Sequence, residues 1–195
     1  MGRDDGDVGQ ASMLTGRVVW TGMGTATKHR LDVSKGVEVL LYVTRRVPSM
    51  YNALKVLYFA DKDHLGRYGR LIYGDSYVAM RHGPVPSAAY DIIKCARGDG
   101  ICPAQVPAQE LLSVSAAHQI TPLREADLRT LSESEVECLD AAIERYGQLP
   151  FGELQRLCHA DKAFQQSGEN DFMPIEAIAA SLPDTDDLLD YLRNG

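Results

Sequence analysis

Four side chains in this sequence are of the types that bind metal ions or transfer protons: Asp61, His64, His82 and His159. Asp61 and His64 are three residues apart, so on a helix they would present a carboxylate and an imidazole on one face. Together the four indicate one hypothesis, a metal-dependent hydrolase. The sequence has no H-E-x-x-H or comparable ligand spacing, so we keep this hypothesis as the alternative.

The same side chains also have structural interpretations. Asp61 precedes Lys62 and Asp63, as at a helix end rich in solvated charge. His82 lies before a glycine and a proline that fix the backbone, which is typical of a hydrogen-bonded anchor at a strand-to-helix corner. His159 is near the end of a predicted helix, where an imidazole can bind free carbonyls. These interpretations are favoured over catalysis.

Other catalytic and nucleotide-binding motifs are not found in the sequence. It contains no G-x-S-x-G, no G-x-G-x-x-G and no G-x-x-x-x-G-K-[ST], and no cysteine has a context that would lower its pKa. The residues therefore show no convincing catalytic set, and we predict no catalytic residue, no metal and no cofactor.

The composition is that of one globular domain. The chain has 195 residues, of which 45% are hydrophobic and 24% charged. A net charge of −7 argues against a surface that neutralises phosphates, so we expect a basic or apolar protein partner, and nucleic acid is unlikely except in autoregulation. The sequence shows neither a membrane span nor a secretion signal, which favours the cytoplasm and excludes a membrane partner.

The cysteines do not form a recognisable pattern. Cys95, Cys102, Cys138 and Cys158 are dispersed without a C-x-x-C pair, which supports neither a zinc knuckle nor a disulfide framework. Three of them fall in helix-like segments, where a reduced cysteine packs as a small apolar residue. We predict four core thiols.

Apolar periodicity predicts a mainly α fold: a compact helical domain of about seven helices with a small antiparallel β element. Residues 1–30 are expected to be a flexible N-terminal arm and residues 31–195 the folded domain. Ser34 is the predicted N-cap of the first helix, Ser49 caps a second helix with a wide apolar surface, and Ser132 begins a capping box. The other helices are expected near residues 88–96, 150–164, 174–182 and 184–194.

Two β pairs are predicted. Residues 71–73 and 76–81 flank a Gly-Asp pair, which suits a two-residue hairpin, and the following Gly-Pro-Val-Pro would turn the chain into the third helix. Residues 111–115 and 118–122 could form a second short pair. Residues 98–110, rich in glycine and proline, are expected to be a surface loop.

Several segments of the sequence resemble a known family. Residues 54–93, "LKVLYFADKDHLGRYGRLIYGDSYVAMRHGPVPSAAYDII", resemble the Panacea domain of SocA-like antitoxins from phages and bacteria. The segments "LSESEVECLDAAIERYG" and "ELQRLCHADKAF" match later parts of that family, so the resemblance covers roughly residues 35–165. Phe164 replaces a tryptophan common in the family, and His82 replaces a tyrosine.

The resemblance implies a non-enzymatic antitoxin that neutralises a cognate toxin, usually encoded in the adjacent gene, by direct protein–protein binding. It also indicates which residues form the family signature or contact the partner: Tyr58, Asp61, Tyr73, Tyr77, His82, Gly83, Pro84, Val85, Pro86, Tyr90, His159 and Phe164. Because apolar and aromatic residues usually pack inside, a structural role is favoured for most of them. A third hypothesis, a transcriptional regulator, is disfavoured by the acidic balance and by the lack of a basic recognition helix.

Overall fold

The structure is a computed structural model that describes residues 30–100, 102–103, 106–183 and 185–194. All but the last residue of the predicted arm, 1–30, lies outside the described residues. The described residues form nine α-helices, which confirms a mainly α fold with a small antiparallel β element. The helices are α1 (Val33–Thr44), α2 (Met50–Tyr68), α3 (Ser87–Arg97), α4 (Ala108–Leu111), α5 (Glu133–Tyr146), α6 (Phe151–His159), α7 (Lys162–Gln165), α8 (Ile175–Ala180) and α9 (Asp186–Asn194).

The two helices beyond the predicted seven are the four-residue elements α4 and α7. Helix α4 begins within the expected surface loop 98–110, extends one residue beyond it, and buries Ala108. Helix α7 is separate because α6 ends at His159 and Asp161 caps a new helix. The Asp161 carboxylate accepts hydrogen bonds from the N–H groups of Ala163 and Phe164.

Side-chain caps define where the longer helices begin. Ser49 caps α2, and the predicted capping box is present at α5, where Ser132 and Glu135 each accept the other's backbone N–H. The predicted cap of α1 was wrong: Asp32, and not Ser34, accepts the N–H of Lys35. A carboxylate at this end of the helix also interacts favourably with the helix dipole.

The predicted hairpin lies one segment further along the chain. Strands β1 (Tyr77–Met80) and β2 (Gly83–Pro86) pair antiparallel, so Arg81 and His82 form the turn, and residues 71–73 are not a strand. The Gly-Pro-Val-Pro segment is thus a strand and not a turn into α3. Strand β5 (Phe172–Met173) adds a third strand beside β1.

The Gly-Asp pair has two other roles that explain this correction. Gly74 has φ +74°, and a Cβ there would lie 2.7 Å from the carbonyl oxygen of Arg30. The Asp75 carboxylate accepts hydrogen bonds from the N–H groups of Ala88 and Ala89, at 2.9 and 3.1 Å, at the start of α3. Asp75 therefore caps α3 from a distance and does not form a turn.

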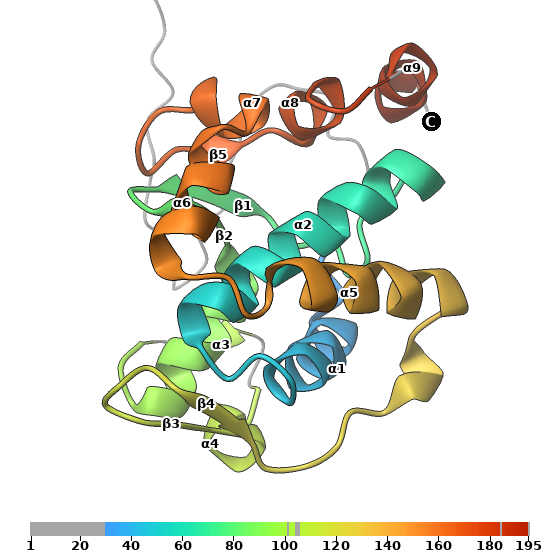
Figure 1. The fold of residues 1–195 in the computed structure, drawn as a ribbon. Helices are drawn as coiled ribbons and strands as arrows, with labels where there is room; N and C mark the ends of the chain where they lie inside the picture. The colour runs from blue at the N-terminus through green and yellow to red at the C-terminus, as the bar shows by residue number, and fades with distance from the viewer. Residues whose placement is uncertain (1–29, 101, 104–105, 184, 195) are drawn as a thin grey trace, which may run out of the picture.

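Helix α2 runs through the centre of the molecule (Figure 1). It packs against α1, α5, α6, α8 and strand β2, as its wide apolar surface predicted. The second predicted β pair is confirmed as β3 (Leu112–Val114) and β4 (Ile120–Pro122), which lie with α3 and α4 on the side of the molecule away from α8 and α9 (Figure 1). No helix among the described residues is long and apolar enough to cross a membrane.

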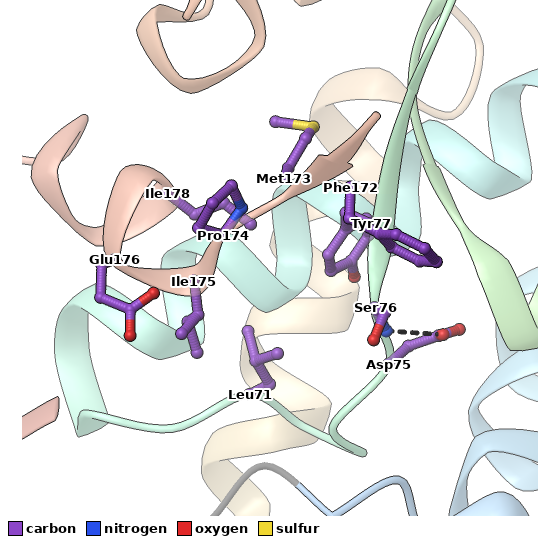
Figure 2. Close-up of a pocket in the computed structure, with 10 residues that line it drawn as sticks. All are labelled: Leu71, Asp75, Ser76, Tyr77, Phe172, Met173, Pro174, Ile175, Glu176 and Ile178. Carbon is purple, nitrogen blue, oxygen red and sulfur yellow. Dashed lines mark hydrogen bonds between the residues drawn. The ribbon is translucent and has the colours of Figure 1, made fainter. Parts of the chain in front are cut away.

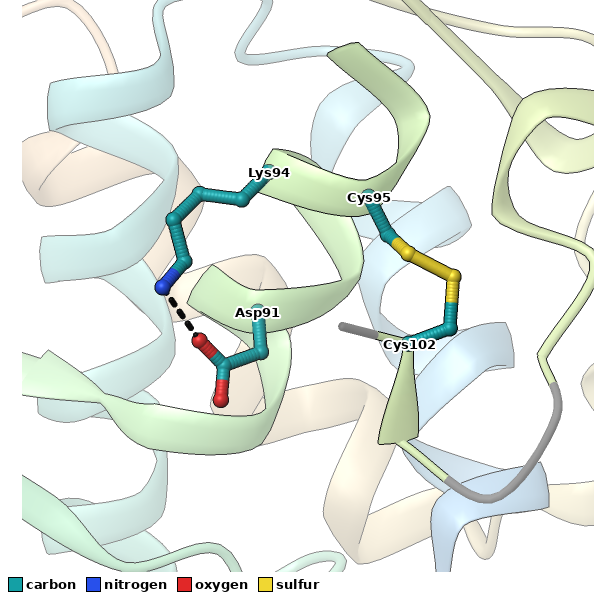
Figure 3. Close-up of a disulfide and its surroundings, with 4 residues drawn as sticks. All are labelled: Asp91, Lys94, Cys95 and Cys102. Atoms are coloured by element: carbon teal, nitrogen blue, oxygen red, sulfur yellow. Dashed lines mark ion pairs between the residues drawn. A yellow bond between two sulfur atoms is a disulfide. The ribbon is translucent and has the colours of Figure 1, made fainter. Parts of the chain in front are cut away.

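The prediction of four reduced thiols was wrong for two of them. Cys95 at the end of α3 and Cys102 form a disulfide with a Cα–Cα distance of 5.4 Å (Figure 3). The glycine-rich turn after α3 brings the chain back to the helix, and the seven-residue spacing gave no recognisable motif. Cys138 and Cys158 are free and buried, as predicted.

Candidate functional site

The structure divides the twelve residues singled out in the sequence into an interior group and a surface group. Eight are buried: Tyr58, Asp61, Tyr73, Tyr77, Gly83, Pro84, Val85 and Pro86. His82 and His159 are exposed, and Tyr90 and Phe164 are half-buried. The interior group builds the corner where α2 meets the hairpin, whereas three of the others meet on the outer face of that hairpin.

Asp61 is a fully buried carboxylate with two donors. Its Oδ1 accepts the N–H of Ile72 at 2.7 Å, and its Oδ2 accepts the hydroxyl of Tyr77 at 2.7 Å. Burial raises the pKa of Asp61 to about 7, although both hydrogen bonds act to lower it. Asp61 therefore ties α2 to the segment that leads into β1 and does not lie at a solvated helix end.

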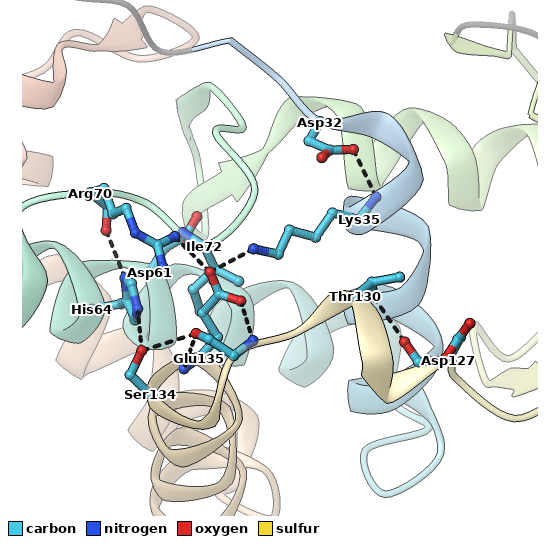
Figure 4. A network of polar contacts seen from close by, with 11 residues as sticks. Asp32, Lys35, Asp61, His64, Arg70, Ile72, Asp127, Thr130, Ser134 and Glu135 are labelled. Carbon is cyan, nitrogen blue, oxygen red and sulfur yellow. Dashed lines mark hydrogen bonds and ion pairs between the residues drawn. The ribbon is translucent and has the colours of Figure 1, made fainter.

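His64 is held in a polar network between α2 and α5 (Figure 4). Its Nδ1 lies 2.8 Å from the carbonyl oxygen of Arg70, and its Nε2 lies 3.3 Å from the hydroxyl of Ser134. Because a carbonyl only accepts, Nδ1 carries the proton and Nε2 accepts from Ser134. Burial lowers the pKa of His64, which favours this neutral form.

Glu135 is the centre of the same network. Lys35 and Arg70 each approach its Oε1 at 2.6 Å, and the N–H of Ser132 donates to its Oε2 at 2.8 Å. Burial acts to raise the pKa of Glu135, but hydrogen bonds from Lys35, Ser132 and Arg70 outweigh burial and lower the pKa. This buried carboxylate, which the sequence marked only as part of a capping box, joins α5 to α1 through Lys35 and to the segment after α2 through Arg70.

The four side chains of the hydrolase hypothesis do not form one site. In the part of the chain that the structure describes, no three His, Cys, Asp or Glu side chains are grouped to hold a metal ion. Asp61 and His64 have partners inside the core, whereas His82 in the hairpin turn bonds Gln155 of α6, and His159 of α6 bonds the backbone of the turn. Among the described residues the geometry thus offers no convergent set for metal-assisted hydrolysis.

His82 is hydrogen-bonded, as expected, but it lies in the hairpin turn and is exposed, so the predicted strand-to-helix corner was wrong. Its Nδ1 lies 2.8 Å from Nε2 of Gln155, and its carbonyl accepts the hydroxyl of Tyr51 at 3.1 Å. Nε2 of His159 lies 3.1 Å from the carbonyl oxygen of Arg81 in the same turn. His159 does bind a carbonyl, but that of the hairpin and not that of its own helix.

These contacts create an exposed surface that we call the turn–α6 surface. It consists of Tyr51, Arg81, His82, Phe151, Gln155, His159 and Phe164. The Phe151 ring is 50% exposed and packs against the rings of Tyr51 and His82, with centroids 4.5 and 5.4 Å away. His159 stacks on Phe164 at 5.1 Å.

Sequence reasoning found three members of this surface and missed the other four. The i, i+4 spacing of Phe151, Gln155 and His159 places them on one helix face, which is a signal that the sequence does contain. Their contact with the turn at Arg81 could be predicted only from the correct position of the hairpin, which the sequence analysis placed one segment too early.

A close approach between the hairpin and α6 positions this surface. Gly83 has φ +107°, and a Cβ there would lie 2.6 Å from Cβ of Cys158 on α6. Only glycine accepts both the backbone angle and the contact. Nearby, the buried Lys55 donates from Nζ to the carbonyl oxygen of Pro84 at 2.7 Å, and burial lowers the pKa of Lys55 to about 8.

A hollow of about 300 Å³ opens beside the turn–α6 surface. Its lining combines the hairpin with α6, α7 and the segment after α7: Ala79, Arg81, His159, Phe164, Gln165, Ser167 and Glu169. Three of these residues belong to the turn–α6 surface, so the hollow is continuous with it. The lining combines aromatic and small residues with polar and charged ones of both signs, Arg81 and Glu169, and is suited to receive a side chain of a protein partner.

A second hollow, of about 290 Å³, lies between β1, β5 and α8 (Figure 2). Its lining is largely apolar, with the polar Asp75 and Ser76 at one end; the apolar residues are Leu71, Tyr77, Phe172, Met173, Pro174, Ile175 and Ile178. Because six of its ten lining residues come after residue 171, this hollow depends on the C-terminal segment and not on the hairpin corner alone.

Comparison with protein families gives one match. Residues 54–165, more than half of the chain, match the model of the family described as "Antitoxin SocA-like, Panacea domain". No curated protein and no solved structure matches the chain. The matched range includes α2 from Leu54, the β1–β2 hairpin, α5, α6 and α7, and therefore every member of the turn–α6 surface except Tyr51. The chain belongs to the SocA-like Panacea antitoxin family.

Proposed function

We propose that this protein is an antitoxin that neutralises a cognate toxin, encoded in the adjacent gene, by binding it directly. The observation that carries the proposal is the family match over residues 54–165. In this proposal residues 31–195 act as one binding domain in the cytoplasm. The protein performs no turnover, and it requires neither a metal nor a cofactor.

Two features of the structure support binding as the activity. The polar side chains that suggested catalysis, Asp61 and His64, are occupied by structural hydrogen bonds in the interior. In contrast, Phe151 and His82 present exposed rings on the turn–α6 surface. Exposed aromatic residues beside a hollow are typical of the anchors of protein–protein interfaces.

We assign different roles to the two groups of signature residues. His82, His159 and Phe164 contact the toxin, together with Phe151. Tyr58, Tyr73, Tyr77, Asp61 and the Gly83–Pro86 strand hold the hairpin and α2 in place, and half-buried Tyr90 packs against the core.

Co-expression tests the proposal. The gene adjacent to this one is induced alone, with the wild-type chain, and with a variant in which Phe151→Ser removes an exposed ring of the surface. We expect growth arrest with the adjacent gene alone, growth with the wild-type chain, and partial arrest with the variant. Growth arrest that is equal with and without the wild-type chain would refute neutralisation.

A further inference from the structure

The net charge of the chain is unevenly distributed. Residues 166–195 contain seven carboxylates and one arginine, a net charge of −6, which leaves −1 for residues 1–165. The acidity that suggested a basic partner thus belongs almost wholly to a segment after the last residue of the family match, residue 165. The electrostatics of the turn–α6 surface therefore depend on the charged side chains of its own elements.

Those elements carry three exposed cations, Arg81 in the hairpin turn, Arg156 in α6 and Lys162 at the start of α7. Within the described residues none of the three forms an ion pair, whereas Arg67, Arg124 and several other basic side chains do. Exposed acidic residues on the same part of the molecule are Glu153 on α6, Glu169 in the hollow and Asp171, whose carbonyl oxygen accepts the N–H of Ala79. Cations that form no ion pair with the described residues leave this part of the molecule electrostatically suited to carboxylates.

We infer that the turn–α6 surface binds an acidic segment of the cognate toxin, with an apolar side chain of that segment in the hollow beside Phe164 and His159. The inference rests on the proposed antitoxin function and adds the chemistry of the partner. Arg81, Arg156 and Lys162 steer the acidic segment to the surface, and the rings of Phe151 and His82 provide the apolar contact.

An acidic protein segment fits this surface better than a nucleic acid does. Three cations neutralise few phosphates, which is too few to hold a long polyanion. The rings are also engaged with one another: His159 stacks on Phe164, and Phe151 packs on Tyr51 and His82. They do not form an open platform on which successive bases could stack.

Association kinetics with the purified product of the adjacent gene test the inference. Three chains are compared: wild type, the triple variant Arg81→Glu, Arg156→Glu, Lys162→Glu, and the control Arg193→Glu. Arg193 is exposed in the last turn of α9, far along the chain from this surface, and undergoes the same charge change. Circular dichroism and thermal unfolding establish that all three are folded.

The expected result is an association rate for the triple variant that is lower than that of wild type by about tenfold or more at about 50 mM salt. The deficit should shrink at about 500 mM salt, where exposed charges are screened. The control should associate like wild type. Acidic-to-lysine changes in the toxin that restore binding to the triple variant would identify the acidic segment.

Two results would overturn the inference while leaving the antitoxin proposal intact: a triple variant that binds and neutralises as wild type does, or an equal loss in the Arg193→Glu control. Binding of a labelled single-stranded RNA or DNA that is lost in the triple variant would overturn it in favour of a nucleic-acid surface. A wild-type chain that does not bind the adjacent gene product would overturn both proposals together.

Discussion

The substitution Asp61→Asn tests the interior of the proposed binding domain. The Asp61 carboxyl is fully buried and accepts hydrogen bonds from the N–H of Ile72 and the hydroxyl of Tyr77. Asparagine has the same shape, its carbonyl oxygen can accept the same N–H, and its NH₂ group can donate to the Tyr77 oxygen. The substitution therefore removes the titration of this residue and leaves its packing intact.

The size of the effect on the free energy of unfolding follows from the difference between the pKa of Asp61 in the unfolded chain and in the folded protein. The pKa of Asp61 is ordinarily 3.8 and is raised to about 7 in the folded protein, chiefly by burial. Between those pH values the unfolded chain loses the proton while the folded protein keeps it, so stability falls as pH rises. The fall is on the order of 4 kcal/mol and is complete above about pH 7, because each tenfold change in acidity is worth about 1.4 kcal/mol.

Urea unfolding followed by circular dichroism, repeated from about pH 4 to about pH 8, measures this effect. The free energy of unfolding of Asp61→Asn, minus that of wild type, should rise by up to about 4 kcal/mol across the range. The pH dependence of stability that comes from other groups, such as His64, is common to both proteins and cancels in the difference. Asp63→Asn, an exposed site on the same helix, is the control for the loss of one charge. A difference that is constant with pH, or that decreases, would refute the assignment of a neutral Asp61 below pH 7.

Three further predictions concern stability and covalent structure. Asp75→Ala removes the remote cap of α3 and should lower the free energy of unfolding by about 2 kcal/mol or more, measured by urea unfolding; an unchanged midpoint contradicts the cap. Gly83→Ala should destabilise by more than about 2 kcal/mol and more than the control Gly98→Ala, because both have positive φ but only Gly83 would bring a Cβ against Cys158; equal costs would mean that the contact is unimportant. Thiol titration of the urea-unfolded chain should find two thiols without reductant and four after reduction; four in both cases contradicts the disulfide.

The helices were largely predictable because local signals determine them. The capping box at Ser132, the cap at Ser49 and the apolar periodicity of α2 all agree with the structure. The hairpin was misplaced because a Gly-Asp pair is a strong local turn signal, whereas its actual roles are nonlocal. Gly74 accommodates the Arg30 backbone, and Asp75 caps a helix that begins twelve residues later. Sequence spacing carries no information about either contact.

The site was predictable only in part, for a related reason. Burial of the tyrosines agrees with the expected structural role of aromatic residues, whereas Asp61 was expected at a solvated helix end and is fully buried. The turn–α6 surface instead depends on α6 packing against the hairpin through Gly83, which joins segments about seventy residues apart. For Phe151 and Gln155 the sequence therefore contained no indication of a place in this surface beyond their shared helix face.

Co-purification tests the central claim, that this protein acts by binding a partner protein, most directly. The tagged chain is expressed with the untagged product of the adjacent gene, and the eluate is analysed by size-exclusion chromatography with light scattering. We predict a stable complex of defined stoichiometry that contains both chains and whose formation accompanies the rescue of growth. Rescue of growth without a complex, together with turnover of a substrate by the purified chain, would contradict the account.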